Sequence, residues 1–292
     1  MLSKIYHYKN IYENNINTAN LKSILYSFLN KRFSSFSISP IETNGTLGYF
    51  FILKTDDKEY FIKTHKNGTI YRNALINEAT IFSTIYKNST YSENIEIDGQ
   101  VFFIMERLYK LEKLPTIQEI KCIIDFYSSV LINFNNISIN LYTFEELYNE
   151  GLYAIQELYS NGLVLNNTCN ICLKKLRTLE PLYLNSNHII CHGDLSNKNI
   201  MLANSYPIAI DWEDCFIGFP NYDFCYWLTF LDQRKFYSAD LFSNNGISND
   251  EGTATMLLIV ILKCYLSFIS GSYLNNKLSF EERILEILNL SD

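Results

Sequence analysis

The residues whose types and spacing most clearly suggest chemistry lie in the run CHGDLSNKN at residues 191–199. Within it, His192, Asp194 and Asn199 form the pattern HxDxxxxN. Asp211 follows twelve residues later, in the run PIAIDWED. A carboxylate such as Asp194 can orient a hydroxyl group and accept its proton. An amide oxygen and a second carboxylate, here Asn199 and Asp211, are the hard ligands that Mg²⁺ prefers. The pattern therefore predicts a phosphoryl-transfer centre.

Residues upstream of this run are of the types that hold phosphates. Lys63 lies in the run YFIKT, a predicted strand, where its charge could neutralise phosphate oxygens. Glu78 lies in the predicted helix that follows and could hold Lys63 by an ion pair. Gly45 and Gly48 lie at a predicted hairpin tip, where glycine lets backbone N–H groups approach phosphates. Each residue alone also fits a surface charge or a plain turn, and their order along the chain favours the functional interpretation.

Other motifs point away from competing classes. The chain has no GxxxxGK[ST] and no GxGxxG motif, so neither a P-loop enzyme nor a dinucleotide-binding dehydrogenase is indicated. Cys169 and Cys172 form a CxxC pair, but zinc needs four ligands and no second pair follows at a matching distance. We interpret these two cysteines, and the odd total of seven, as reduced thiols in a cytoplasmic protein.

The elements that must position these residues form two unequal groups. Hydrophobic periodicity predicts a helix over residues 18–33. A sheet with one helix follows, with strands at 36–42, 49–55, 59–64, 94–97 and 101–105 and the helix at 71–86. From residue 116 the pattern is mainly helical, as at 117–134 and 143–160, with a β interruption near 188–211. We expect an α+β fold whose two parts span residues 1–106 and 107–292, with a hinge near 106–113.

Size and composition bound the class of protein. The 292 residues are 48% hydrophobic and 19% charged, as in a folded globular protein. The net charge of −7 provides no global electrostatic footprint for nucleic acid or an anionic membrane. We therefore expect neutral or cationic small-molecule partners unless a local basic pocket exists. The apolar stretch 256–269 is short and contains Lys263, so it predicts a buried core helix. No secretory signal is visible in residues 1–20, which favours the cytoplasm.

These motifs resemble the aminoglycoside phosphotransferase / choline kinase family within the protein-kinase-like fold. The resemblance is carried by HGDLSNKN at 192–199, IDWED at 210–214 and FPNYDFCYWL at 219–228, while Lys63 and Glu78 match more loosely. It implies a two-lobed α+β fold, with a small antiparallel N-lobe and a larger helical C-lobe. It also implies ATP or GTP bound between the lobes with Mg²⁺, and transfer of the γ-phosphoryl group to a small-molecule hydroxyl.

Carried over by position, the resemblance implies a role for each matching residue. Asp194 corresponds to the catalytic base, and Asn199 and Asp211 correspond to the metal ligands. His192 matches a histidine that organises the catalytic loop. Asp223 matches a carboxylate that braces this loop.

The nucleotide side of the resemblance is assigned in the same way. Lys63 corresponds to the lysine that contacts the phosphates, with Glu78 as its partner. Gly45 and Gly48 fall where phosphate contacts would occur, although the glycines are sparse there. The adenine is expected to lie against the segment from Met105 to Leu108 and to use its backbone groups.

Three departures from protein kinases favour a small acceptor. The tripeptide at Asp194 is HGD rather than HRD, and Ser196 stands where protein kinases usually have a lysine. The metal motif is DWE rather than DFG. All three departures suit the small-molecule branch of the fold.

The acceptor itself stays open at this stage. Aromatic residues around Trp227 could hold the quaternary ammonium group of choline or the amine of ethanolamine. They could equally be core residues. Acidic residues including Glu213 could attract an aminoglycoside or amino sugar, or form an ordinary solvated surface. A neutral sugar is equally compatible.

Three functional classes remain in order of preference. The first is an active small-molecule kinase, since every group the chemistry needs is retained. The second is a catalytically silent nucleotide-binding protein, and the third is a protein kinase. The oligomeric state and the choice between ATP and GTP are left open by the sequence.

Overall fold

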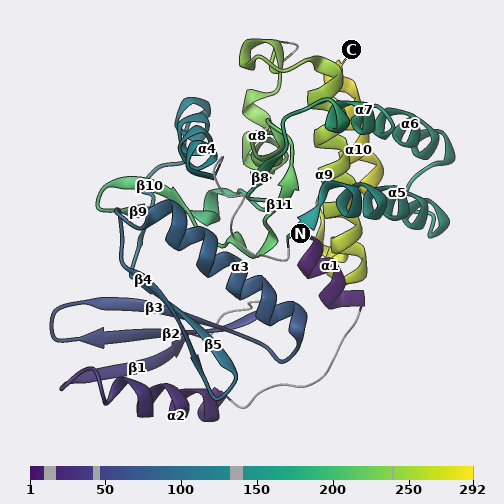
Figure 1. The fold of residues 1–292 in the computed structure, drawn as a ribbon. Coiled ribbons are helices and arrows are strands. Elements are labelled where there is room, and N and C mark those ends of the chain that lie inside the picture. Colours follow the sequence, from purple (N-terminus) through teal and green to yellow (C-terminus); the bar gives the residue numbers. More distant parts are fainter. Residues whose placement is uncertain (10–17, 42–46, 132–140, 239, 292) are drawn as a thin grey trace.

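The computed structural model describes residues 1–9, 18–41, 47–131, 141–238 and 240–291. They form an antiparallel sheet flanked by helices, followed by a larger part that is mainly helical (Figure 1). The predicted α+β order along the chain is confirmed. The division into two domains between residues 106 and 107 stays a prediction.

The N-terminal sheet has the strand order β1-β2-β3-β5-β4, and neighbouring strands are antiparallel. Its strands and the two helices that accompany it are β1 (Phe36–Ile41), β2 (Gly48–Thr55), β3 (Glu59–His65), β4 (Ser92–Ile97), β5 (Gln100–Glu106), α2 (Thr18–Leu29) and α3 (Thr69–Tyr86). The predicted strands all occur, because alternating apolar residues and short polar turns define them locally. The helix predicted at 18–33 is α2, and it packs on the sheet as well, so the sheet has two accompanying helices instead of one.

Alternation along the strands sends side chains to two different helices. Phe102 and Ile104 of β5 pack with α2, whereas Phe103 packs with α3. On β3, Ile62 faces α2, so its neighbour Lys63 faces α3. This period of two therefore places the lysine on the side of the sheet that meets the rest of the molecule.

The second part of the molecule surrounds a long central helix. Its helices are α4 (Ile117–Leu131), α5 (Phe144–Ser160), α6 (Asn166–Leu176), α7 (Leu179–Leu184), α8 (Tyr222–Leu228), α9 (Asn249–Ile269) and α10 (Phe280–Leu288). By length and composition alone, α9 is the one helix in the described ranges that could cross a membrane. Most of its central residues are buried against α5, α8 and α10, as predicted for a core helix.

Short strands and 3₁₀ helices complete this part. Two three-stranded sheets have the orders β10-β9-β6 and β7-β11-β8. Their strands are β6 (Tyr109–Lys110), β7 (Tyr142–Thr143), β8 (Ile189–Cys191), β9 (Ile200–Ala203), β10 (Tyr206–Ala209) and β11 (Phe216–Gly218). The 3₁₀ helices are η1 (Asn197–Asn199), η2 (Trp212–Asp214), η3 (Leu231–Phe236), η4 (Ser243–Asn245), η5 (Ser272–Asn275) and η6 (Asn289–Ser291).

One short helix was not predicted. Helix α1 (Leu2–Lys9) contacts α9, α3 and η2, and Figure 1 shows it where the sheet part meets the helical part. Leu2 and Ile5 are buried in this contact. Eight residues with so few apolar anchors show too little periodicity to be recognised from the sequence. The position of α1 matters because it brings a lysine to the site described below.

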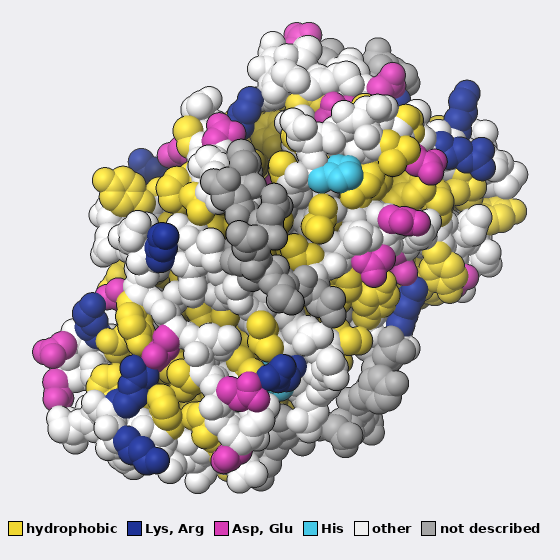
Figure 2. Space-filling view, viewed as in Figure 1, with side chains coloured by type: hydrophobic (Ala, Val, Ile, Leu, Met, Phe, Trp, Pro, Cys, Tyr) yellow, Lys and Arg dark blue, Asp and Glu magenta, His cyan; other side chains and the backbone are white. Residues whose placement is uncertain are grey.

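The visible surface carries charges of both signs. On the face shown in Figure 2, lysine and arginine side chains are interspersed with aspartate and glutamate rather than gathered into a continuous basic field. This distribution agrees with the low overall charge density read from the composition.

Candidate active site

The loop after β8 carries Asp194 and is held by a buried carboxylate. Asp223, at the start of α8, accepts hydrogen bonds from the backbone N–H groups of His192 (2.7 Å) and Gly193 (3.0 Å). The hydroxyl of Tyr127 donates a third bond to it at 2.7 Å. These bonds fix the backbone just before Asp194.

His192 connects this loop to the segment that carries Asp211. Its ring is completely buried. Nδ1 lies 3.3 Å from the backbone N–H of Asp194, and Nε2 lies 2.8 Å from the carbonyl oxygen of Ile210. Accepting at Nδ1 requires the proton to be on Nε2, which then donates to the carbonyl. Both ring nitrogens are thus used in organising the loop, and neither faces the cleft as a proton acceptor.

Gly193 is required by its surroundings, which leads to a testable prediction. Its φ is +78°, and an added Cβ would lie 2.1 Å from the carbonyl oxygen of Asp214. We expect Gly193→Ala to lower the free energy of unfolding by about 3 kcal/mol or more, because left-handed strain adds to the clash. Gly99 is a matched control, since its φ is also +78° but no heavy atom lies within 4 Å of the added Cβ.

Chemical denaturation of the two glycine variants tests this geometry. Gly99→Ala should lose only the conformational contribution, about 1 kcal/mol. Equal losses in the two variants would contradict the close packing of the catalytic loop on η2.

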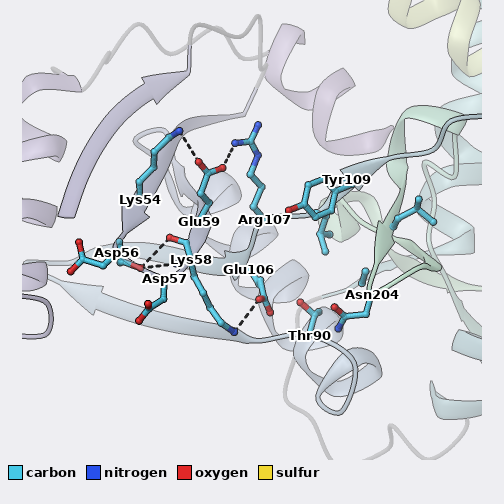
Figure 3. A pocket seen from close by; sticks show the side chains of 14 residues that line it. Lys54, Asp56, Asp57, Lys58, Glu59, Thr90, Glu106, Arg107, Tyr109 and Asn204 are labelled. Carbon is cyan, nitrogen blue, oxygen red and sulfur yellow. Dashed lines mark hydrogen bonds and ion pairs between the residues drawn. The ribbon is translucent and has the colours of Figure 1, made fainter. Parts of the chain in front are cut away.

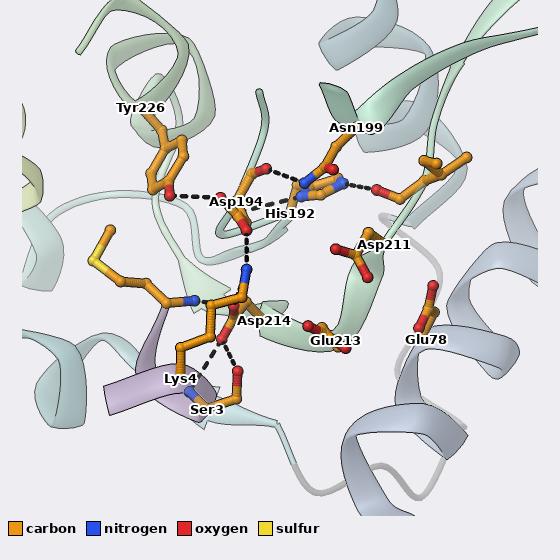
Figure 4. A network of polar contacts seen from close by, with 12 residues as sticks. Ser3, Lys4, Glu78, His192, Asp194, Asn199, Asp211, Glu213, Asp214 and Tyr226 are labelled. Carbon is orange, nitrogen blue, oxygen red and sulfur yellow. Dashed lines mark hydrogen bonds and ion pairs between the residues drawn. The ribbon is translucent and has the colours of Figure 1, made fainter. Parts of the chain in front are cut away.

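Asp194 is held by two side chains from distant parts of the chain (Figure 4). The hydroxyl of Tyr226 donates to Oδ1 and the amine of Lys4 donates to Oδ2, each at 2.6 Å. Burial alone would raise the pKa of Asp194, but the charge of Lys4 and both hydrogen bonds outweigh it and lower the pKa. The carboxylate is therefore ionised at neutral pH, as a proton acceptor must be.

Asp214 in η2 anchors the helix that carries Lys4. Its Oδ1 accepts from the backbone N–H of Ser3 at 3.1 Å and from the Ser3 hydroxyl. The amine of Lys4 lies 3.8 Å from Oδ2, and the terminal amine of Met1 also pairs with this carboxylate. The sequence analysis missed Lys4 entirely, since Lys4 belongs to no recognisable motif, and it did not single out Tyr226 within the run FPNYDFCYWL. Only the fold brings them to Asp194.

Lys63 lies at the centre of three carboxylates. Its Nζ is 2.6 Å from Glu78, 2.6 Å from Asp211 and 2.9 Å from Glu213. The predicted ion pair with Glu78 is therefore present. Burial alone would lower the pKa of Lys63, but the three carboxylates reverse this and raise it well above its usual value. Burial raises the pKa of Glu78 to about 8, with Lys63 acting in the opposite direction.

The carboxylates around Lys63 form a donor set that fits a divalent cation. Oxygen atoms of Glu78, Asp211 and Glu213 lie within 4.8 Å of one another. Asn199 donates through Nδ2 to the backbone oxygen of Asp194 at 2.8 Å, so its amide oxygen is left as a further acceptor. Oxygen donors of this kind suit Mg²⁺. The structure thus places Glu213 beside Lys63 rather than on a separate acceptor surface.

Backbone geometry delivers Asp211 to this cluster. Strand β10 ends at Ala209, two residues before Asp211, in agreement with the predicted position after a strand. Asp211 itself has φ 67° and ψ 56°, the left-handed region that aspartate tolerates better than most residues. Such conformations are concentrated at functional sites, where the surrounding structure enforces them.

A cavity of about 450 Å³ brings together four of the predicted nucleotide-binding residues, Lys63, Glu78, Met105 and Leu108. One end is polar and contains Lys63, Glu78, Asn199 and Asp211. The remainder is mainly apolar, with walls formed by Phe50, Ile52, Phe61, Met105, Leu108, Met201 and Ile210. Apolar walls beside a cationic and metal-binding end suit a nucleotide, whose base is flat and whose phosphates are charged. Met105 and Leu108 line it where the adenine was expected.

A second cavity, of about 480 Å³, is lined by the β2–β3 turn and by the segment that follows β5 (Figure 3). Its basic side chains are paired with acids. Glu59 binds both Lys54, at 2.6 Å, and Arg107, while Lys58 lies 3.1 Å from Glu106. These surface pairs connect the β2–β3 turn to the segment after β5, and we assign them a structural role.

Three further residues singled out in the sequence lie elsewhere. Gly45 is outside the described residues. Gly48 begins β2, where a Cβ would lie 2.7 Å from the carbonyl oxygen of Thr64, so glycine permits close strand packing. Trp227 is completely buried and donates its indole N–H to Asn197 at 2.8 Å. Its position in the core braces the catalytic loop and gives an acceptor no access to the ring.

Comparisons with known proteins bear on the family and the fold of this chain. Residues 165–252 match the phosphotransferase enzyme family. The matched segment contains Asp194, Asn199, Asp211 and Asp223, and it confirms the resemblance stated from the sequence. No curated protein matches this sequence significantly.

Solved structures show that the chain has the kinase-like fold of such phosphotransferases. The aminoglycoside phosphotransferase APH(4)-Ia is 13% identical, with a TM-score of 0.63 over 93% of this chain and 99% of that one. The choline kinase LicA from Streptococcus pneumoniae is 14% identical, with a TM-score of 0.57 over 93% and 99%. The spectinomycin phosphotransferase APH(9)-Ia, in complex with ADP and spectinomycin, is 12% identical, with a TM-score of 0.58 over 91% and 92%.

Proposed function

We propose that this protein is a small-molecule kinase that transfers the γ-phosphoryl group of ATP or GTP to a hydroxyl group. The observation that supports this most directly is a single cleft that combines the Lys63–Glu78 pair with Asn199 and Asp211. An ionised carboxylate, Asp194, lies next to this cleft. The segment that matches the phosphotransferase family contains three of these five residues.

Each residue has a defined task in this proposal. Lys63 neutralises phosphate oxygens, and Glu78 keeps its amine in place. Asn199 and Asp211, with Glu213 nearby, would hold Mg²⁺, whose chemical contribution is to offset negative charge on the phosphates. Asp194 orients the acceptor hydroxyl and takes up its proton.

The acceptor is proposed only as a class. The named neighbours act on an aminoglycoside, spectinomycin or choline, which supports a small hydroxyl compound without selecting one. Aminoglycosides, choline or ethanolamine, and sugars are therefore all candidates. We also propose that the protein works in the cytoplasm, where nucleoside triphosphates are available.

Nucleoside-diphosphate release with Mg·ATP and with Mg·GTP tests the function. The reactions would include a panel of choline, ethanolamine, aminoglycosides, amino sugars and neutral sugars, with Asp194→Asn as the negative control. Stimulation by one acceptor class that disappears in the variant is the expected result. Tight nucleotide binding without turnover on any acceptor would instead favour a catalytically silent protein, and labelling of a protein substrate would favour a protein kinase.

A further inference from the structure

A third cavity, of about 360 Å³, lies between α9 and α10 and has a basic lining. Lys263, Lys277 and Arg283 contribute to its walls, and none of the described residues that line it is acidic. The protein as a whole has a net charge of −7, so three cations without an acid in one cavity depart from its average surface. A volume of this size accommodates a small ligand or one end of a larger one.

Lys263 is the central feature of this cavity. Its amine donates to the hydroxyl of Thr229 at 2.7 Å and lies 3.4 Å from the ring centre of Phe230 and 4.0 Å from that of Tyr226. In the described part of the chain, it forms no ion pair with a carboxylate. A desolvated amine with a hydroxyl and two aromatic rings as neighbours lacks the counter-charge that such groups normally have.

The charges around Lys263 also favour an anion next to its amine. Burial lowers the pKa of Lys263 well below its usual value, and the charges of Arg283 and Lys4 lower it further, with Asp194 opposing them. Arg283 is held beside Lys263 by a 2.6 Å hydrogen bond to the carbonyl oxygen of Thr229, while its other terminal nitrogen pairs at 2.6 Å with Glu286, a carboxylate that it shares with Arg234. An anion bound here would supply the counter-charge that Lys263 lacks and would lie next to a guanidinium that shares its one carboxylate with Arg234.

The cavity is linked to the proposed base by one side chain. Tyr226 offers its ring to Lys263 and its hydroxyl to Asp194, at 2.6 Å. The amine of Lys263 and the carboxylate of Asp194 therefore contact the same tyrosine side chain, which is almost fully buried. This proximity is what connects the cavity to the proposed site of the acceptor hydroxyl.

The acidic residues expected on the acceptor side are largely engaged elsewhere. Glu213 pairs with Lys63, Asp214 holds α1, and Asp250 pairs with Lys175 on α6 at 2.6 Å. Glu251 accepts from Asn221 at 3.0 Å. The charges next to Asp194 on this side are instead those of Lys4 and Lys263. This arrangement disfavours a polycationic acceptor.

We propose that the cavity between α9 and α10 binds an anionic group of the acceptor, a carboxylate or a phosphate, through Lys263 and Arg283 with help from Lys277. The proposal rests on the proposed kinase function and narrows its acceptor class. This cavity would be the local basic pocket that the net negative charge of the chain did not exclude.

Matched pairs of acceptors test the assignment through turnover. Ethanolamine and serine differ by a carboxylate, and glycerol and glycerol 3-phosphate differ by a phosphate. We expect the anionic member of at least one pair to have a kcat/KM about tenfold or more above its neutral partner. Lys263→Gln should raise KM for the anionic member about tenfold or more and should change KM for the neutral member much less. Equal use of neutral and anionic acceptors would overturn the assignment.

Direct binding separates this proposal from the kinase function. Calorimetric titration of wild type with inorganic phosphate and with acetate should detect binding that weakens about tenfold in Lys263→Gln. Lys277→Gln is a second test, because Lys277 is exposed and its replacement leaves the core intact. Lys174→Gln, at an exposed position on α6, removes the same charge outside the cavity and should change nothing.

Each outcome has a distinct meaning. Binding of neither anion, or equal binding by wild type and both cavity variants, overturns the anion site whatever the turnover results. Binding that depends on Lys263, combined with equal use of neutral and anionic acceptors, assigns the cavity to a free anion and overturns the acceptor assignment. Absence of turnover on every acceptor overturns the kinase function and the acceptor assignment together, while the titration still decides the anion site.

Discussion

Asp194→Asn is expected to reduce turnover about 10²- to 10⁴-fold while leaving nucleotide affinity nearly unchanged. Asparagine has the same shape but cannot take up the proton of an acceptor hydroxyl. The amide oxygen can still accept from the Tyr226 hydroxyl, and the amine of Lys4 keeps Asp214 as a neighbour at 3.8 Å. The loop should therefore stay in place, and the loss should appear in kcat rather than in the Kd of the nucleotide.

Steady-state rates and nucleotide titrations on the same preparations check this expectation. Asp98→Asn is the matched control, since Asp98 lies in the exposed β4–β5 turn with φ 52°, which asparagine also tolerates. Wild-type turnover by Asp194→Asn would remove Asp194 from the role of base. A large loss of nucleotide binding in this variant would point to a structural role for the residue instead.

The parts of the site that could be predicted are those encoded over short distances along the chain. Lys63 faces α3 because successive side chains of a strand point to opposite faces, and the run EYFIKTH indicates the strand itself. Asp194 and Asn199 share one loop, and Asp211 comes just after a strand that its β-branched and apolar neighbours indicate. In each case the pattern that defines the element also defines the direction or position of the functional side chain.

The parts that could not be predicted depend on contacts between distant segments. Lys4 and Asp194 are 190 residues apart, and only the docking of α1 on η2 brings them together. A single lysine in an eight-residue helix carries no pattern that points to a partner. The same holds for Lys263, which a hydropathy reading identifies only as an interruption in an apolar helix.

Residue type alone also leaves the environment ambiguous. Trp227 and Tyr226 are adjacent aromatic residues on α8, yet Trp227 is fully buried and braces the loop through Asn197, whereas Tyr226 holds Asp194 and faces Lys263. A helix sends neighbouring residues in different directions, so one substitution changes packing and the other changes the site. Packing, rather than composition, decides which aromatic is functional.

Lys63→Met is expected to have the second large effect, on nucleotide affinity and on stability together. Loss of a charge-assisted contact to phosphate should weaken nucleotide binding about 10- to 100-fold. The same change leaves Glu78, Asp211 and Glu213 close together without their shared cation. Removing one partner of a buried ion pair typically costs about 3–5 kcal/mol, so the free energy of unfolding should fall by a similar amount.

Urea denaturation and nucleotide titration of Lys63→Met measure the two effects separately. Lys54→Met is the matched control, because Lys54 lies on the adjoining strand β2 and pairs with Glu59 at the surface. Its loss should change the free energy of unfolding by less than about 1 kcal/mol and leave nucleotide binding intact. Equal stability losses in the two variants would show that the carboxylates around Lys63 do not need its charge. Unchanged nucleotide affinity in Lys63→Met would exclude contact between this amine and the phosphates, and the polar end of the cleft would then require a different assignment.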